Sequence, residues 1–161
     1  HYVITEEDTE KATQIMNENG IKPEFETFDL ADIKYLNHLI KKGLPQEPYW
    51  VSMLFGGNGT FPNAETMLAA TRALPDKSML NVIGVGAAQF PMVAMGIILG
   101  HHVRVGLEDN VFYGPHEPAK SNAQMVERVV RLARDLGRPI ATPAQAREMM
   151  GLGAPRAYSF P

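Results

Sequence analysis

Patterns typical of strands alternate with patterns typical of helices along most of this chain, and this alternation constrains the fold more than any other feature. The predicted strands cover residues 24–28, 49–55, 79–85 and 102–110, with starts roughly 25 to 30 residues apart and a helical pattern in each gap. Parallel strands need crossovers of this kind, and such crossovers are right-handed. We therefore predict an α/β fold with a parallel sheet built from about four βα units.

Polar capping residues and glycines mark the ends of the predicted helices. Thr5 with Asp8, and Asp29 before an apolar stripe, are typical of helix N-termini. Serine or threonine followed three residues later by glutamine, first at Ser121 and again at Thr142, predicts two further helices that begin with capping boxes. The predicted helices lie between Thr5 and Gly20, Asp29 and Gly43, Pro62 and Pro75, Gln89 and Leu99, Ser121 and Ala133, and Thr142 and Gly151, and residues 154–161 are expected to form a tail.

The last predicted strand, His102–Asn110, has valines and a leucine on one face and Arg104 and Glu108 on the other. The central strands of an open parallel sheet are usually apolar on both faces, whereas barrel strands direct polar side chains inward near their carboxyl ends. The pattern therefore favours a (β/α)8 TIM barrel. A complete barrel needs about 250 residues. We expect this chain of 161 residues to form half of one, as a single domain over residues 1–161, with the preceding units missing.

Arg104, Glu108 and Asp109 are the strongest candidates for a functional site, because a cation and two adjacent carboxylates converge at one predicted strand end. An interior salt bridge between Arg104 and Glu108 would explain that pair equally well by packing alone. Asp109 favours a function, since adjacent carboxylates repel each other unless a cation or a proton lies between them.

Composition restricts the class of partner. The net charge is −3 and there is no block of lysine or arginine, which argues against nucleic acid or an anionic membrane as the main partner. The chain has no cysteine and begins with nothing that resembles a signal peptide, so we expect a cytoplasmic protein that acts on small molecules. The longest apolar run, Phe90–Leu99, is far shorter than the roughly 20 residues that span a bilayer.

Several segments resemble the C-terminal half of the β-keto acid cleavage enzyme family, and together they cover most of the chain. The most specific is the Arg-x-Gly-x-Glu-Asp-Asn run from Arg104 to Asn110, whereas the capping boxes and glycine turns are individually common. The segments that carry the resemblance are Lys22–Asp29, Gly56–Pro62, Val82–Gln89, Gly100–Asn110, Ser121–Arg128 and Ala141–Arg147.

This resemblance implies a zinc-dependent TIM barrel that condenses a β-keto acid with acetyl-CoA, releasing acetoacetate and a new CoA thioester. It implies that Glu108 is a ligand of Zn²⁺, that Asp109 takes part in proton abstraction, and that Arg104 organises the carboxylates and an anionic intermediate. These roles agree with physical chemistry, because zinc acts as a Lewis acid and an arginine stabilises an anion in a desolvated site.

The chain departs from the family in its histidines. The family binds zinc with a His-x-His pair on an early strand, and the only close pair here is His101–His102. Adjacent residues on a strand point to opposite faces, so this pair cannot chelate one ion in the same way. We expect both histidines to be structural, at the start of their strand. Our hypothesis is that the isolated chain binds zinc weakly or not at all and is inert.

Two glycine-rich stretches are candidates for contacts with CoA, at Gly57 and Gly59 and at Gly84 and Gly86. Backbone N–H groups beside a helix N-terminus can bind phosphates. Backbone geometry alone is the more common reason for such glycines. Ala87 stands where many members of the family have a basic residue. Glu26 is a further candidate for a substrate contact.

Two alternatives to a CoA-dependent enzyme are open. A metal-dependent aldolase or lyase on the same barrel would cleave its substrate without CoA. A catalytically silent half-barrel would pair with a copy of itself, because its first and last strands would otherwise be unpaired edges. In each case a homo-oligomer is expected.

Overall fold

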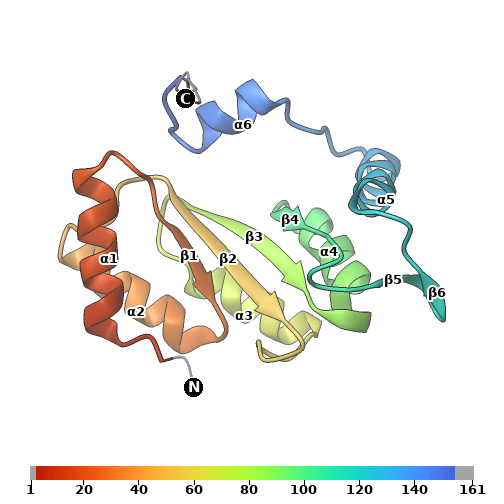
Figure 1. Ribbon diagram of the computed structural model, residues 1–161, viewed down its shortest axis with the longest axis horizontal. Helices are drawn as coiled ribbons and strands as arrows, with labels where there is room; N and C mark the ends of the chain where they lie inside the picture. Colours follow the sequence, from red (N-terminus) through yellow and green to blue (C-terminus); the bar gives the residue numbers. More distant parts are fainter. Residues whose placement is uncertain (1–2, 155–161) are drawn as a thin grey trace, which may run out of the picture.

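The computed structural model describes residues 3–154, and these form one parallel sheet with helices on its outer side (Figure 1). The strands lie in the order β1-β2-β3-β4, each parallel to its neighbour. This α/β arrangement is that of half a TIM barrel and confirms the predicted fold class. The strands are β1 (Glu24–Thr27), β2 (Tyr49–Phe55), β3 (Ser78–Gly84) and β4 (His102–Arg104).

A helix precedes β1, and helices follow the four strands. A short antiparallel hairpin interrupts the last connection, and α6 lies near the ends of the sheet where the strands begin (Figure 1). In residues 3–154 no helix combines the length and the hydrophobicity that a membrane crossing requires. Apart from Ala154, the predicted tail lies outside the described residues. The remaining elements are α1 (Glu6–Glu18), α2 (Leu30–Lys41), α3 (Ala64–Ala73), the 3-10 turn η1 (Gly86–Ala88), α4 (Gln89–Ile98), β5 (Phe112–Gly114), β6 (Glu117–Pro118), α5 (Asn122–Asp135) and α6 (Pro143–Met149).

The predicted helix caps are largely confirmed. Thr5, Asp29 and Thr142 each begin a helix with a complete capping box. Ser121 caps α5 by accepting from the N–H of Gln124, but the Gln124 side chain accepts from the N–H of Lys120 and not from that of Ser121. The reciprocal half of that predicted box is therefore wrong.

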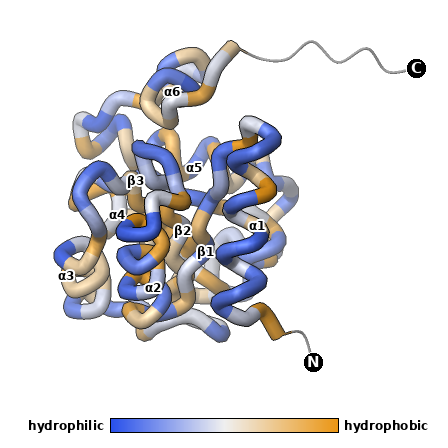
Figure 2. Tube along the Cα trace, turned by 90° about the vertical axis from the view of Figure 1, so that its left-hand side faces the viewer, coloured by the Kyte–Doolittle hydropathy of each residue, from blue (hydrophilic) through white to orange (hydrophobic). Residues whose placement is uncertain are grey.

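The outer face of the sheet carries the main core. Val51, Met53 and Phe55 alternate along β2 and are fully buried against α2, α3 and α4. A second cluster joins Val93 of α4 to Val129 of α5. Figure 2 shows hydrophobic residues gathered along the central strands β2 and β3, whereas α1 is mostly hydrophilic.

The inner face of the sheet is polar. Strand register places Glu26, Ser52, Asn81 and His102 in one row across the four strands. Arg104 lies on the same face two residues further along β4. This polarity is what distinguished a barrel from an open sheet in the sequence, and it positions the candidate site.

The prediction of one long strand over 102–110 is wrong, because β4 ends at Arg104. The carbonyl of Gly106 accepts from the N–H groups of Asp109 and Asn110, at 3.2 and 3.1 Å, which closes a turn. Glu108 therefore lies on a turn and not on a strand face. The strands predicted at 24–28 and 79–85 also differ slightly from the structure, ending at Thr27 and Gly84.

Candidate active site

The site is centred on the Arg104 guanidinium at the carboxyl end of β4. Its Nε donates to Asp109 Oδ2 at 3.0 Å and its Nη2 to Asp109 Oδ1 at 2.8 Å. Such a two-point contact between planar groups fixes both side chains more firmly than a single hydrogen bond. The Asp109 side chain is only 6% exposed, so this is a nearly buried carboxylate paired with a partly exposed cation.

Two further carboxylates surround the same guanidinium. Nη2 of Arg104 also donates to Glu108 Oε2 at 3.2 Å, and Nη1 lies 4.0 Å from Glu26 Oε1. The Glu108 side chain is 84% exposed, and this hydrogen bond is its one contact with the arginine. The structure thus brings Arg104, Glu108 and Asp109 together, although from a strand end and a turn and not from one strand.

Charge distribution keeps Arg104 protonated. The hydrogen bonds that Arg104 donates to Asp109 raise the pKa of Arg104 above its ordinary value, and partial burial opposes this only in part. The carboxylates of Asp109, Glu108 and Glu26 outnumber the one guanidinium. The site can therefore hold a carboxylate base beside a fixed positive charge. It also has carboxylate oxygens that Arg104 does not bind and that can accept further hydrogen bonds.

The residues that the structure describes do not by themselves fit a zinc ion. Within residues 3–154, no three histidine, aspartate or glutamate side chains form a group that could hold a metal. Glu108 supplies a single exposed carboxylate, and a structural or catalytic zinc site needs three or four protein ligands.

The two adjacent histidines lie at the start of β4, away from the guanidinium. His101 Nε2 is 2.9 Å from the hydroxyl of Thr71, and the ring of His102 lies 5.2 Å from that of Trp50. Burial, followed by the charge of Arg138, lowers the pKa of both histidines. These contacts agree with the structural role expected for them.

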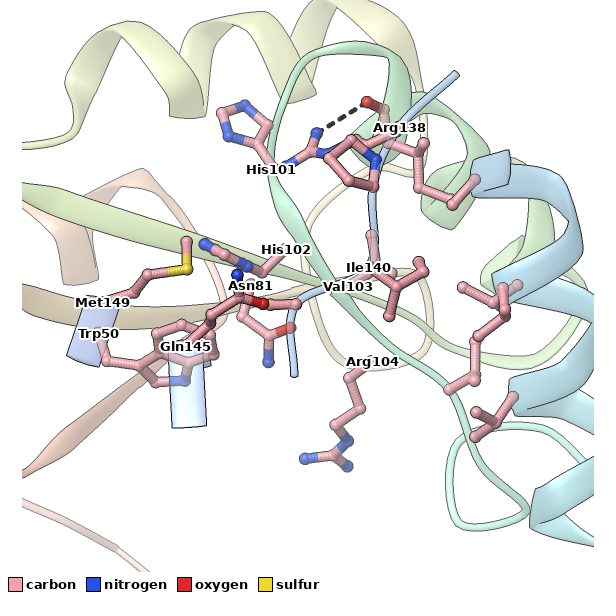
Figure 3. A pocket seen from close by; sticks show the side chains of 18 of the residues that line it. Trp50, Asn81, His101, His102, Val103, Arg104, Arg138, Ile140, Gln145 and Met149 are labelled. Atoms are coloured by element: carbon pink, nitrogen blue, oxygen red, sulfur yellow. Dashed lines mark hydrogen bonds between the residues drawn. The ribbon is translucent and has the colours of Figure 1, made fainter. Parts of the chain in front are cut away.

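Arg104 and the histidines border one open pocket of about 920 Å³, which extends from the inner face of the sheet past β4 to α5 and α6. Figure 3 shows Arg104 pointing away from His101 and Arg138, toward the other side of this pocket. Trp50 and Asn81 also line the pocket, with the Trp50 ring against that of His102. The pocket therefore has a histidine end, where the strands begin, and a guanidinium end, where the strands finish.

The backbone conformation and close packing at the four glycines proposed to contact CoA are sufficient to explain why these positions are glycine. A Cβ atom on Gly59 would lie 2.3 Å from the Leu54 carbonyl oxygen, and one on Gly84 would lie 2.5 Å from Gln89 Cα. Gly57 and Gly86 have φ angles of +59° and +60°. The N–H of Gly86 donates to the Asp109 carbonyl at 2.7 Å, so this glycine supports the turn that carries the carboxylates.

Sequence reasoning missed a second polar network on the inner face. Asn81 Nδ2 donates to Ser52 Oγ at 2.9 Å, and Ser52 Oγ donates to Glu24 Oε1. Both Ser52 and Asn81 are buried. The sequence does contain a signal for a polar inner face on β2, because Trp50 and Ser52 alternate with the apolar residues of this strand at a period of two.

Comparison of the sequence with known proteins finds one family profile and several curated relatives, and these agree with one another. The family profile described as beta-keto acid cleavage enzyme matches residues 1–152. A protein of Acetoanaerobium sticklandii, 3-keto-5-aminohexanoate cleavage enzyme, is 43% identical over 94% of this chain and 56% of its own length. One of the same name from Fusobacterium nucleatum is 42% identical over 94% of this chain and 55% of its own length.

A more distant similarity extends to other substrates. The 3,5-dioxohexanoate:acetyl-CoA acetone transferase of Paraburkholderia graminis is 34% identical over 83% of this chain and 45% of its own length. The chain thus spans about half the length of the curated relatives that it matches. Two of these names describe the cleavage of a keto acid, and the third describes an acetone transfer that involves acetyl-CoA.

Proposed function

This chain belongs to the β-keto acid cleavage enzyme family, and on that premise we propose that it supplies part of an acetyl-CoA-dependent β-keto acid cleavage site. The reaction condenses a β-keto acid with acetyl-CoA and yields acetoacetate and a new acyl-CoA. The observation that carries the proposal is the two-point Arg104–Asp109 contact at the carboxyl end of β4, beside the exposed Glu108. Barrel enzymes perform their chemistry at this end of the strands.

Asp109 and Arg104 are the proposed catalytic groups. Asp109 is an acceptor that can take a proton from the carbon between the keto and carboxylate groups of the substrate. Arg104 holds the carboxylate in one orientation and stabilises the negative charge that then develops on the substrate oxygens. The nearly complete burial of Asp109 supports this proposal, because an electrostatic interaction is stronger in a desolvated site.

Glu108 is proposed to contribute one ligand to a zinc site. Its exposed carboxylate has one oxygen on Arg104, which leaves the other available to a cation. The other ligands would have to come from outside residues 3–154, since these hold no group of three candidates. We therefore propose that the isolated chain neither binds zinc tightly nor turns over substrate.

Contacts with CoA are proposed at the glycine-rich ends of β2 and β3. A pocket of about 500 Å³ lies beside Gly57 and Gly59, next to Phe28 and Asp29. Gly84 ends the neighbouring strand β3, and Gly86 begins the turn η1 that follows it. The helices α3 and α4 begin close to these loops, and helix N-termini favour phosphate groups.

The assembled enzyme is proposed to be a cytoplasmic homo-oligomer, with this chain as a single domain. The absence of cysteine from the sequence is compatible with a reducing compartment. Within residues 3–154, β1 and β4 each pair with one neighbour only, so each leaves an edge that another chain could cover.

A chimera tests the function directly. Residues 1–152 of this chain would replace the matching half of the Acetoanaerobium sticklandii relative. We expect acetyl-CoA-dependent acetoacetate formation with a panel of β-keto acids, and a fall of about a thousandfold or more in the Arg104→Ala and Asp109→Asn variants. Glu108→Gln should lower the zinc content of the chimera, and Glu127→Gln, which changes an exposed glutamate of α5, is its matched control.

The outcomes are distinct. Full activity in the Arg104→Ala and Asp109→Asn chimeras would contradict the proposed catalytic groups. Cleavage that needs no CoA would favour an aldolase or lyase. The isolated chain, measured for zinc content and turnover beside the chimera, is expected to show neither.

A further inference from the structure

The turn that carries the two carboxylates, Gly106–Asn110, is held from outside by side chains that have no part in the chemistry proposed above. Its central acceptor is the Gly106 carbonyl, which receives the N–H groups of Asp109 and Asn110. Gln89, at the start of α4, donates its Nε2 to the same oxygen at 3.1 Å. A side chain from another element thus fixes the acceptor on which the turn depends.

The opposite side of the turn has a similar contact. The Leu107 N–H donates to Asn122 Oδ1 at 2.7 Å, and Asn122 is the first residue of α5. A Cβ atom on Gly106 would lie 3.3 Å from that same oxygen, so the turn and the Asn122 side chain are closely packed. The turn is therefore clamped between the N-termini of α4 and α5.

The burial of Gln89 is unfavourable for stability alone. Its side chain is fully buried, and within the described part of the chain its Oε1 atom has no hydrogen-bond partner. An unpaired buried oxygen is destabilising, whereas an apolar side chain of the same size would leave none. Gln89 is explained if its amide serves to hold the Gly106 carbonyl in place.

We propose that Gln89 and Asn122 are positioning residues, which hold the Gly106–Asn110 turn and through it keep the Asp109 carboxylate on Arg104. The inference rests on the proposed function for its significance, since Arg104 and Asp109 are the groups assigned there. Its geometry can be tested independently of any activity, because the contact that it explains is present in this chain.

The test measures hydrogen exchange at the Arg104 Nε–H by NMR on the full chain. This proton lies in the contact with Asp109 Oδ2, and the signal is identified by its loss in Arg104→Lys. In Gln89→Met we expect its exchange to become roughly five- to tenfold faster, with unchanged exchange of the amides of β2 and β3. Asn122→Ala removes the second contact at an exposed position and should act in the same direction.

A matched control comes from Ser78, whose Oγ atom is the other buried side-chain oxygen without a partner in residues 3–154. Ser78→Ala should leave the Arg104 signal unchanged. Unaltered Arg104 exchange in the folded variants would overturn the proposal, as would equal acceleration of Arg104 and the sheet amides, which indicates a purely structural role. If Gln89→Met does not fold, Asn122→Ala decides by the same two criteria. An inactive chimera with a responsive Arg104 signal would refute the proposed function and leave this inference intact.

Discussion

The two faces of the four-stranded sheet differ in composition and in what they contribute. On the outer face, β2 presents Val51, Met53 and Phe55, all fully buried under helices. On the inner face the same strand carries Trp50, which lines the open pocket, and the buried Ser52, which accepts a hydrogen bond from Asn81. One strand thus stabilises the fold with one set of side chains and lines the candidate site with the other, because its side chains alternate. The comparison predicts that substitutions on the two faces have separable effects.

Phe55→Ala on the outer face should have the largest effect on stability. The ring is fully buried in the main core, and loss of such a ring typically costs about 3–5 kcal/mol. Trp50→Ala, a matched loss of an aromatic ring on the inner face, should cost less, since Trp50 is only half-buried. Urea denaturation of both variants measures the difference. Equal losses would show that the inner face is also part of the core.

Arg104→Ala should have the next largest effect on stability, because it leaves the Asp109 carboxylate nearly buried and unpaired. Removal of one partner from a fully buried pair typically costs 3–5 kcal/mol, and the 34% exposure of Arg104 reduces this to about 2 kcal/mol. The double variant Arg104→Ala/Asp109→Ala should recover part of the loss. If the single and double variants are equally stable, the pair contributes nothing beyond packing.

Asn81→Ala tests the network that links β3, β2 and β1 across the inner face. Asn81 donates to Ser52, so its removal should cost about 1 kcal/mol. Ser52→Ala should cost a similar amount, and the double variant should cost less than the sum because the two groups share one hydrogen bond. Strict additivity in denaturant melts would show that the contact is not energetically coupled.

Glu108→Gln should hardly change stability, because its exposed contact with Arg104 is worth less than about 0.5 kcal/mol. The same substitution in the chimera should lower the zinc content, measured by metal analysis after dialysis. A large loss of stability would place Glu108 among the structural residues. An unchanged zinc content would remove it from the proposed ligands.

Mild acid should weaken the fold slightly through His101 and His102. Burial and the charge of Arg138 lower the pKa of both histidines below the ordinary 6.5, so below this pH the unfolded chain binds more protons than the folded chain. Stability is therefore full above about pH 6.5 and falls as the pH decreases, by a few tenths of a kcal/mol for such partly exposed groups. His101→Gln/His102→Phe should flatten the dependence of the urea midpoint between about pH 7 and 5. An unchanged slope would contradict this assignment.

The sheet could be predicted from the sequence because each of its signals is local. Alternating apolar residues in 49–55, the capping box at Thr5 and the glycine stops depend on neighbours within a few positions. The end of β4 could not be predicted in this way. Its turn depends on Gln89 and Asn122, which are 17 and 15 residues away from Gly106 and Leu107.

Residue chemistry determined the polar character of one sheet face, the choice of a barrel over an open sheet, and the grouping of Arg104 with two carboxylates. Only the tertiary structure decided how those carboxylates differ, with Asp109 nearly buried in a two-point contact and Glu108 84% exposed on one hydrogen bond. The reason is physical. Periodicity assigns a side chain to a face, whereas its burial and its partners depend on where a turn places it against distant elements.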